Sequence, residues 1–227
     1  MSTIDVKAAC LWENVATRRW GKYLSDVEWK ALQFATGQFD EPGAALEVGA
    51  EAGRWSQRLI GQGWRLTCTD ICAEKVALCQ RNNPTAACHL VAAEQTTLPV
   101  QDQSMDLVFA IEVPISSQAW FVKECCRVLR PGGILVTVLL NRASWRGMVD
   151  RWKPTEQFYT HSYQAFQRNL LRQRFEVLRT DGFAWLPLPR FSDSRLAGYA
   201  STIESLTGLR HVPWLSPWVA VVARCGR

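Results

Sequence analysis

Apolar runs and amphipathic stretches alternate through the middle of this chain. A helix-like segment over 8–36, with apolar residues recurring near helical spacing, ends at a Gly- and Pro-containing break over 37–43. Five short apolar runs then predict strands over 44–49, 65–70, 87–92, 105–111 and 134–140, and helices are expected over 53–62, 73–82 and 117–130. This alternation predicts a mainly parallel sheet with helices on both faces.

The C-terminal third is less regular. Residues 141–159 are polar and aromatic without a clear period, and a helix near 160–174 and a strand over 175–181 are expected after them. A loop-rich piece then leads to a closing strand over 218–224. No apolar run approaches the roughly 20 residues of a membrane span, and the N-terminus has no signal-peptide core, so we expect a cytoplasmic protein.

The distribution of charge and the cysteine content limit the kinds of partner and metal site that the chain is expected to have. Residues 142–227 carry 13 Lys and Arg against 6 Asp and Glu, a net charge of +7, whereas residues 1–141 carry a net charge of −2. This asymmetry indicates either a solvated basic face or contact with something anionic. The eight cysteines contain no CxxC pair and only three histidines accompany them. We therefore expect buried thiols that pack as small apolar residues, and no metal site.

One stretch carries candidate binding chemistry. A strand ending in the acid Glu47 is followed by a small-residue turn from Gly49 to Gly53 and by the start of a helix. Such a turn lets backbone approach a ligand closely, and the helix start adds N–H groups. Asp70 follows 21 residues after Gly49, at the end of the next strand, where nucleotide-binding α/β folds place the carboxylate that holds ribose hydroxyls.

Together with the segment Arg127-Val128-Leu129-Arg130-Pro131-Gly132-Gly133, these motifs resemble the class I S-adenosylmethionine-dependent methyltransferases of the small-molecule type, over about 44–140. The resemblance implies a Rossmann-like, doubly wound α/β sheet of about seven strands, the last antiparallel, with S-adenosylmethionine as cofactor. It also implies one domain over 1–227, with an N-terminal helical segment (1–43), a cofactor-binding core (44–140) and a C-terminal part with a substrate cap (141–227).

The resemblance carries over to individual residues. It assigns Glu47 to the cofactor ammonium, Asp70 to the ribose and Glu94 to the adenine amino group. The full set of expected cofactor contacts is Glu47, Gly49, Ala50, Glu51, Gly53, Asp70, Ile71, Glu94 and Gln95. Structural alternatives stay open: Glu47 could bond the turn, Asp70 could cap a helix, and Glu94 could be an exposed loop residue.

Glu51 departs from the family pattern, which has glycine at this position. A like charge here would be unfavourable for the carboxylate of the cofactor. Glu51 therefore turns to solvent, pairs with Arg54 or the cofactor ammonium, or weakens cofactor binding.

Two residues are candidates for catalysis. Glu112 follows the fourth expected strand, on the methyl-transfer side in the family, and His161 is the one histidine of the expected cap. Each residue also has a purely structural alternative. Glu112 could be a structural acid, and His161 could be a partly exposed residue at the start of a helix. The resembled enzymes often place a histidine after the acid, whereas Val113 and Pro114 stand here, so that base is absent.

These observations predict methyl transfer from S-adenosylmethionine to a small-molecule or lipid-like acceptor at oxygen, and an anionic acceptor would suit the basic C-terminal part. The alternatives are methylation of a nucleic-acid or carrier-bound substrate, and a non-catalytic cofactor-binding protein of the same fold. A nicotinamide-dependent dehydrogenase is disfavoured, because the Gly49 turn lacks the G-x-G-x-x-G spacing.

Overall fold

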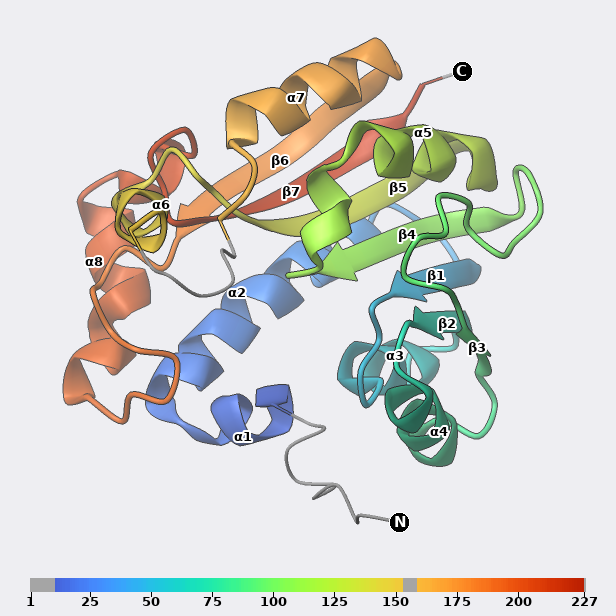
Figure 1. The fold of residues 1–227 in the computed structure, drawn as a ribbon, viewed down its shortest axis with the longest axis horizontal. Coiled ribbons are helices and arrows are strands. Elements are labelled where there is room, and N and C mark those ends of the chain that lie inside the picture. The colour runs from blue at the N-terminus through green and yellow to red at the C-terminus, as the bar shows by residue number, and fades with distance from the viewer. Residues whose placement is uncertain (1–10, 153–158, 227) are drawn as a thin grey trace.

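A computed structural model describes residues 11–152 and 159–226, so expectations that concern residues 1–10 and Phe158 lie outside the described residues. The described chain contains a seven-stranded sheet in the order β3-β2-β1-β4-β5-β7-β6 (Figure 1). The strands are β1 (Ala44–Val48), β2 (Arg65–Asp70), β3 (Ala87–Leu90), β4 (Met105–Ile111), β5 (Leu129–Leu140), β6 (Phe175–Phe183) and β7 (Trp218–Cys225). The first five are parallel, and β7 runs antiparallel to both β5 and β6, which confirms the Rossmann-like expectation.

Eight α-helices accompany the sheet in the described part of the chain. They are α1 (Leu11–Thr17), α2 (Arg19–Thr36), α3 (Arg54–Ile60), α4 (Ala73–Asn82), α5 (Ala119–Val128), α6 (Trp145–Asp150), α7 (Tyr163–Arg172) and α8 (Ala200–Leu206), and three short 3-10 turns are η1 (Pro114–Ser117), η2 (Arg195–Tyr199) and η3 (Leu209–His211). The single helical segment expected over 8–36 is divided near Arg18. Helices α6 and α8 were not predicted, because six and seven residues are too few for a periodic signal.

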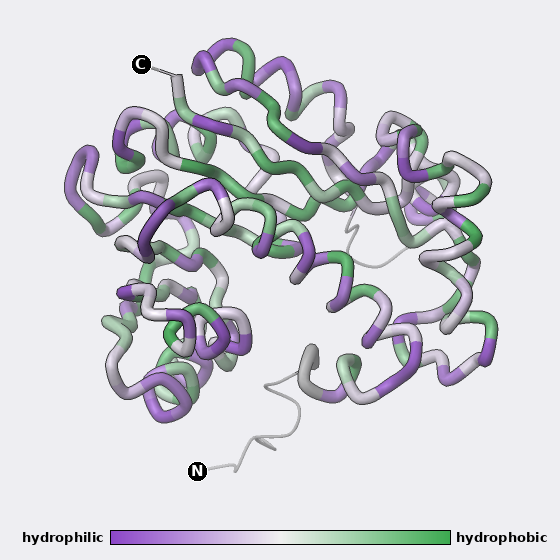
Figure 2. The backbone as a smooth tube through the Cα atoms, turned by 180° about the vertical axis from the view of Figure 1, so that it is seen from behind, coloured by the Kyte–Doolittle hydropathy of each residue, from purple (hydrophilic) through white to green (hydrophobic). Residues whose placement is uncertain are grey.

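The helices form a layer on each face of the sheet. Along β4, Leu107 and Phe109 pack with residues of α2 and α3, whereas Val108 and Ala110 pack with residues of α5 and α7. Successive side chains of a strand point to opposite faces, so one apolar strand serves both cores. Figure 2 shows the hydrophobic segments running through the strands, with hydrophilic segments mostly on outer helices and loops.

The C-terminal part forms a cap that is held to α2. Tyr23 of α2 donates its hydroxyl to Glu204 of α8, and the backbone N–H groups of Ala184 and Trp185 donate to the Tyr23 hydroxyl and to Glu204. Figure 1 shows α6 and α8 beyond the carboxyl ends of β4 and β5. Ligands of open α/β sheets bind at those ends, so the cap stands beside the expected site.

Across residues 11–152 and 159–226, no helix combines the length and the apolar character that a bilayer crossing needs.

Candidate active site

A groove with a polar and an apolar compartment lies at the carboxyl ends of β1, β2 and β4. Charged residues line the polar compartment, namely Glu47, Glu51, Arg54, Asp70, Lys75 and Glu112. Mostly apolar residues line the other, including Val91, Ala92, Leu98, Pro99, Ile115 and Trp120. Gly49, Asp70, Ile71, Val113 and Pro114 border both compartments. The groove therefore suits a ligand with one charged end and one flat apolar end.

The turn after β1 needs glycine at both of its ends. Gly49 has φ +73°, and a Cβ there would lie 2.6 Å from Cγ2 of Val113. Gly53 has φ +74°, and a Cβ there would lie 2.3 Å from Nδ2 of Asn83. The backbone N–H groups of Gly49 and Ala50 both donate to the Thr69 carbonyl, which ties the turn to β2. Any side chain at Gly49 would fill space that borders both compartments of the groove.

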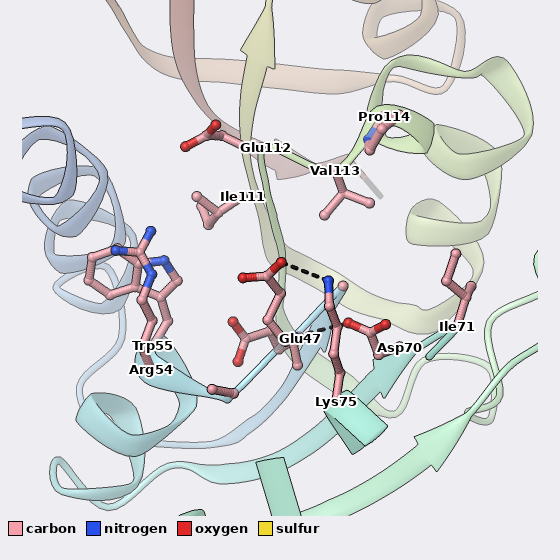
Figure 3. Close-up of a pocket in the computed structure, with 14 residues that line it drawn as sticks. Glu47, Arg54, Trp55, Asp70, Ile71, Lys75, Ile111, Glu112, Val113 and Pro114 are labelled. Atoms are coloured by element: carbon pink, nitrogen blue, oxygen red, sulfur yellow. Dashed lines mark hydrogen bonds and ion pairs between the residues drawn. The ribbon is translucent and has the colours of Figure 1, made fainter. Parts of the chain in front are cut away.

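Glu47 is buried at the end of β1, with its side chain toward the groove (Figure 3). Its Oε2 accepts hydrogen bonds from the backbone N–H and the hydroxyl of Ser56 in α3. Burial raises the pKa of the Glu47 carboxyl to about 8, because desolvation outweighs the stabilising bonds from Ser56. Glu47 thus bonds the first turn of α3, whereas the structural alternative had it bonding the N–H groups of the glycine turn, and it also lines the groove. Its contact with a cofactor ammonium stays a prediction.

Asp70 lies at the junction of the two compartments. Its Oδ2 accepts from the backbone N–H of Glu51 and its Oδ1 from that of Cys72, each at 3.0 Å. A carboxylate oxygen has two lone pairs, so each oxygen keeps capacity for a second donor. Cys72 is itself the N-cap residue of α4, so this bond is not the helix-capping role that we left open for Asp70. The remaining acceptor capacity, on a residue that borders the groove, suits a pair of ribose hydroxyls.

Glu51 lines the groove and forms an ion pair that the sequence analysis did not anticipate. Its Oε1 lies 2.8 Å from Nζ of Lys75 in α4, whereas Arg54 donates instead to Ser25 and Glu28 of α2. Glu51 keeps a positive φ of +50°, the conformation that glycine adopts freely. The position therefore retains glycine-like backbone, and Lys75 neutralises the added charge.

Some of the residues that are expected to contact the cofactor line the apolar compartment. Ile71 borders both compartments and is 64% exposed. Gln95 lines the apolar compartment, and its side-chain amide donates to the carbonyl of Thr97. Glu94 is exposed and lies outside the residues that line the groove, so its adenine contact stays a prediction.

Glu112 belongs to a cluster of two buried acids and two partly exposed arginines. Arg190 of the cap donates to Oε2 of Glu112 at 3.3 Å, and Arg54 donates to Oε2 of Glu28 at 2.8 Å. Oε1 of Glu28 and Oε1 of Glu112 are both buried, and no donor among the described residues reaches either of them. Burial raises the pKa of both groups, and two adjoining buried carboxyls are most stable when they share one proton.

Sequence reasoning missed Glu28 as part of this cluster, although a signal was present. Leu24, Glu28 and Leu32 follow each other at four-residue spacing in α2, and all three are completely buried. A glutamate on the apolar stripe of a helix needs a partner. Arg190 offered no comparable signal, because it lies in an irregular loop of the cap.

His161 is not brought together with Glu112 in the groove. Its carbonyl accepts from the backbone N–H of Arg142, and it forms an isolated bridge with Asn141 after β5. Its side chain is not among the residues that line either compartment. A base role for His161 stays a prediction without geometric support.

The described residues fit S-adenosylmethionine, the cofactor that the resemblance implies. The cradle at Gly49 would be filled by a Cβ, the groove has one charged and one apolar end, and Asp70 stands between them. The ion pair with Lys75 also neutralises Glu51, whose charge would otherwise be unfavourable for the carboxylate of the cofactor.

Comparison with known proteins also indicates a methyltransferase. Residues 46–137 match the methyltransferase domain family. A malonyl-(acyl-carrier protein) O-methyltransferase of Methylococcus capsulatus is 28% identical over 180 residues, which cover 74% of this chain and 61% of that protein. One from Enterobacter lignolyticus is 28% identical over 168 residues, covering 72% and 63%. The chain thus spans slightly less than two thirds of the length of these curated relatives.

Solved structures share the fold at low sequence identity. Geranyl diphosphate C-methyltransferase from Streptomyces coelicolor, in complex with S-adenosyl-L-homocysteine, has a TM-score of 0.62 at 14% identity and covers 86% of this chain and 78% of that one. The (4+2)-cyclase SpnF has a TM-score of 0.64 at 20% identity, covering 88% and 80%. Residues 46–137 thus match a methyltransferase domain, and the strand order and fold of the chain are those of class I S-adenosylmethionine-dependent methyltransferases.

Proposed function

We propose that this chain transfers a methyl group from S-adenosylmethionine to an oxygen atom of a small acceptor. The observation that carries the proposal is the two-compartment groove with Asp70 at its junction. When bound, the cofactor supplies a methyl group on a sulfonium sulfur, and the enzyme chiefly aligns the acceptor with it.

The groove residues divide the work of holding the cofactor. Glu47 and the Gly49 turn face the charged amino-acid end, Asp70 accepts from the ribose hydroxyls, and the apolar compartment receives the base. The Lys75 ion pair keeps the Glu51 carboxylate from repelling the amino-acid carboxylate.

The acceptor then binds toward the cap, near Glu112 and Arg190. Burial raises the pKa of the Glu112 carboxyl, which makes it a stronger base for the proton that a hydroxyl acceptor loses on methylation. The paired Glu28 gives that proton a second carboxyl to share. Arg190 lies at the same point and favours an acceptor that carries negative charge nearby.

A carrier-bound acyl acceptor is the second candidate, because the relatives from Methylococcus and Enterobacter are malonyl-(acyl-carrier protein) O-methyltransferases. The net charge of +7 over residues 142–227 would attract an acidic carrier surface. A carboxylate acceptor has no proton to lose, so in this case Arg190 matters and the basicity of Glu112 does not.

The two candidates separate in one assay. The purified chain is incubated with S-adenosylmethionine labelled in its methyl group and with either free hydroxyl compounds or malonyl-loaded carrier protein. Glu112→Gln should reduce transfer to a hydroxyl about 100-fold and leave transfer to a carboxylate within a few-fold. Cofactor binding without transfer to any member of either set would favour the non-catalytic alternative.

A further inference from the structure

Three cysteines that are distant in sequence meet beneath the glycine turn. The sulfur atoms of Cys68 in β2, Cys79 in α4 and Cys88 in β3 all lie within 4.8 Å of one another, with 3.5 Å between those of Cys79 and Cys88. The register of the sheet pairs Cys68 with Cys88, and α4 places Cys79 against them. Spacing along the chain could not show this, because the sheet register and the packing of α4 create the cluster.

The donor set is all sulfur. In the described part of the chain, no imidazole or carboxylate oxygen joins these three atoms at the same separation, and none of the three thiols is in a disulfide. Metal–thiolate bonds of about 2.3 Å in a trigonal arrangement put the sulfurs about 4 Å apart, which lies within the observed range. Soft thiolate ligands select soft d10 ions, and three ligands fall short of the four that structural Zn²⁺ sites use.

We propose that Cys68, Cys79 and Cys88 form a three-sulfur site for a soft d10 metal ion, with Cu(I) as the ion that suits three sulfur ligands. Each thiol that ligates as thiolate releases its proton to solvent, and neither metal nor sulfur changes oxidation state. This proposal replaces the expectation that the thiols serve only as apolar packing.

The surroundings tie this site to the cofactor turn. Asn83, at the end of α4, donates its side-chain amide to the carbonyls of Gly53 and Cys79. The hydroxyl of Ser56 lies 3.0 Å from the Cys68 sulfur and also bonds Glu47. A bound ion would fasten α4 to β2 and β3, and so stabilise the base on which the turn rests.

One cysteine of the cluster is accessible, and another cysteine outside the cluster serves as a control. Cys88 is half-buried, whereas Cys68 and Cys79 are each 1% exposed, so Cys88 is the side from which an ion enters. Serine at a half-buried position is tolerated by the fold more easily than at the two buried ones. Cys72, at the start of α4, donates to Glu74 and is not in the cluster, which makes Cys72→Ser the matched control.

The test is a titration of the reduced, full-length chain with Cu(I) in competition with a chromophoric chelator, with Zn(II) and Cd(II) in parallel. We expect one Cu(I) per chain, a dissociation constant about 100-fold weaker in Cys88→Ser, and no change in Cys72→Ser. The thermal midpoint should rise with Cu(I) in the wild type and in Cys72→Ser only, because the ion binds the folded chain.

Failure to retain any of the three ions against the chelator would overturn the site, as would equal affinity in Cys88→Ser. Retention of Zn(II) but not Cu(I) would overturn the choice of ion. Binding of S-adenosylhomocysteine to the metal-free chain is measured separately, so neither failure bears on the proposed methyl transfer.

Discussion

At the scale of single residues, the two strand-end acids of the groove have different surroundings. Glu47 is buried against α3 and its pKa is raised to about 8, whereas Asp70 receives two backbone N–H groups. A cationic ligand group favours the ionised form of Glu47, so a proton must leave that carboxyl when the ligand binds below pH 8. The proposed contact of Glu47 with the cofactor ammonium therefore predicts that cofactor affinity depends on pH.

We expect the affinity of the metal-free chain for S-adenosylhomocysteine to rise with pH, by about tenfold per unit between roughly pH 6 and 7, and to level off above about pH 8. Calorimetry in buffers of different ionisation enthalpy should show proton release below pH 8. Glu47→Gln should bind more weakly at pH 8 and lose the pH dependence. A pH-independent wild type would contradict the role of Glu47.

The raised pKa of Glu47 also makes the stability of the folded chain depend on pH. Glu47 holds its proton more tightly in the folded chain than in the unfolded chain, where its ordinary pKa is 4.5. Its contribution to the free energy of unfolding is therefore fully present below about pH 4.5 and is lost as the pH rises toward 8.

At the scale of elements, the predictable parts are those with a local signal. Strand β2, helix α4 and strand β4 have the predicted bounds, because each has a periodic or apolar pattern that ends at or just before an Asn or an acid. The strand-end residues Glu47 and Asp70 follow from chain order alone. Lys75 reaches the groove, and Glu28 and Arg190 reach Glu112, only through the packing of α4, α2 and the cap, which no local pattern encodes.

The glycine turn provides a prediction at this scale. Gly49→Ala should lower the free energy of unfolding by about 1–3 kcal/mol, because its Cβ would meet Val113 in a left-handed backbone conformation. It should also weaken cofactor binding. Gly198→Ala is the control, because no heavy atom lies within 4 Å of a Cβ at that position and its φ is not positive. Equal effects in urea unfolding would contradict the account of the turn.

The ion pair between the turn and α4 gives another prediction. Lys75→Ala should weaken binding of S-adenosylmethionine about 5- to 10-fold, because the freed Glu51 carboxylate then repels the carboxylate of the cofactor. The double variant Glu51→Ala/Lys75→Ala should recover most of that loss in calorimetry. If the double variant binds no better than Lys75→Ala, the charge of Glu51 is not the cause.

At the scale of the whole molecule, the cap and α2 form part of the same folded unit as the sheet. Glu204 is completely buried and accepts from Tyr23 and from the backbone of Trp185. The sequence predicted a cap but not these contacts of Glu204, because α8 is short and its one acid lies among polar neighbours. We therefore expect the single domain over 1–227 to unfold in one step.

Glu204→Ala should lower the free energy of unfolding by about 2–4 kcal/mol, since it leaves the Tyr23 hydroxyl and the Trp185 N–H without their buried acceptor. Glu176→Ala, at an exposed carboxylate, should change it by less than about 0.5 kcal/mol. Urea unfolding followed by tryptophan fluorescence and by circular dichroism should give coincident transitions. Separate transitions would mean that the cap unfolds on its own.

The claim on which the rest depends is that the groove at β1, β2 and β4 binds S-adenosylmethionine through Asp70. The most direct test is calorimetric titration of the chain with S-adenosylmethionine and S-adenosylhomocysteine, with Asp70→Ala as the variant and the exposed Asp40→Ala as its control. Two lost charge-assisted hydrogen bonds correspond to about 3 kcal/mol, or roughly 150-fold in affinity. The account predicts one micromolar site in the wild type and in Asp40→Ala, weakened about 150-fold in Asp70→Ala; absence of binding at millimolar ligand, or unchanged affinity in Asp70→Ala, would contradict it.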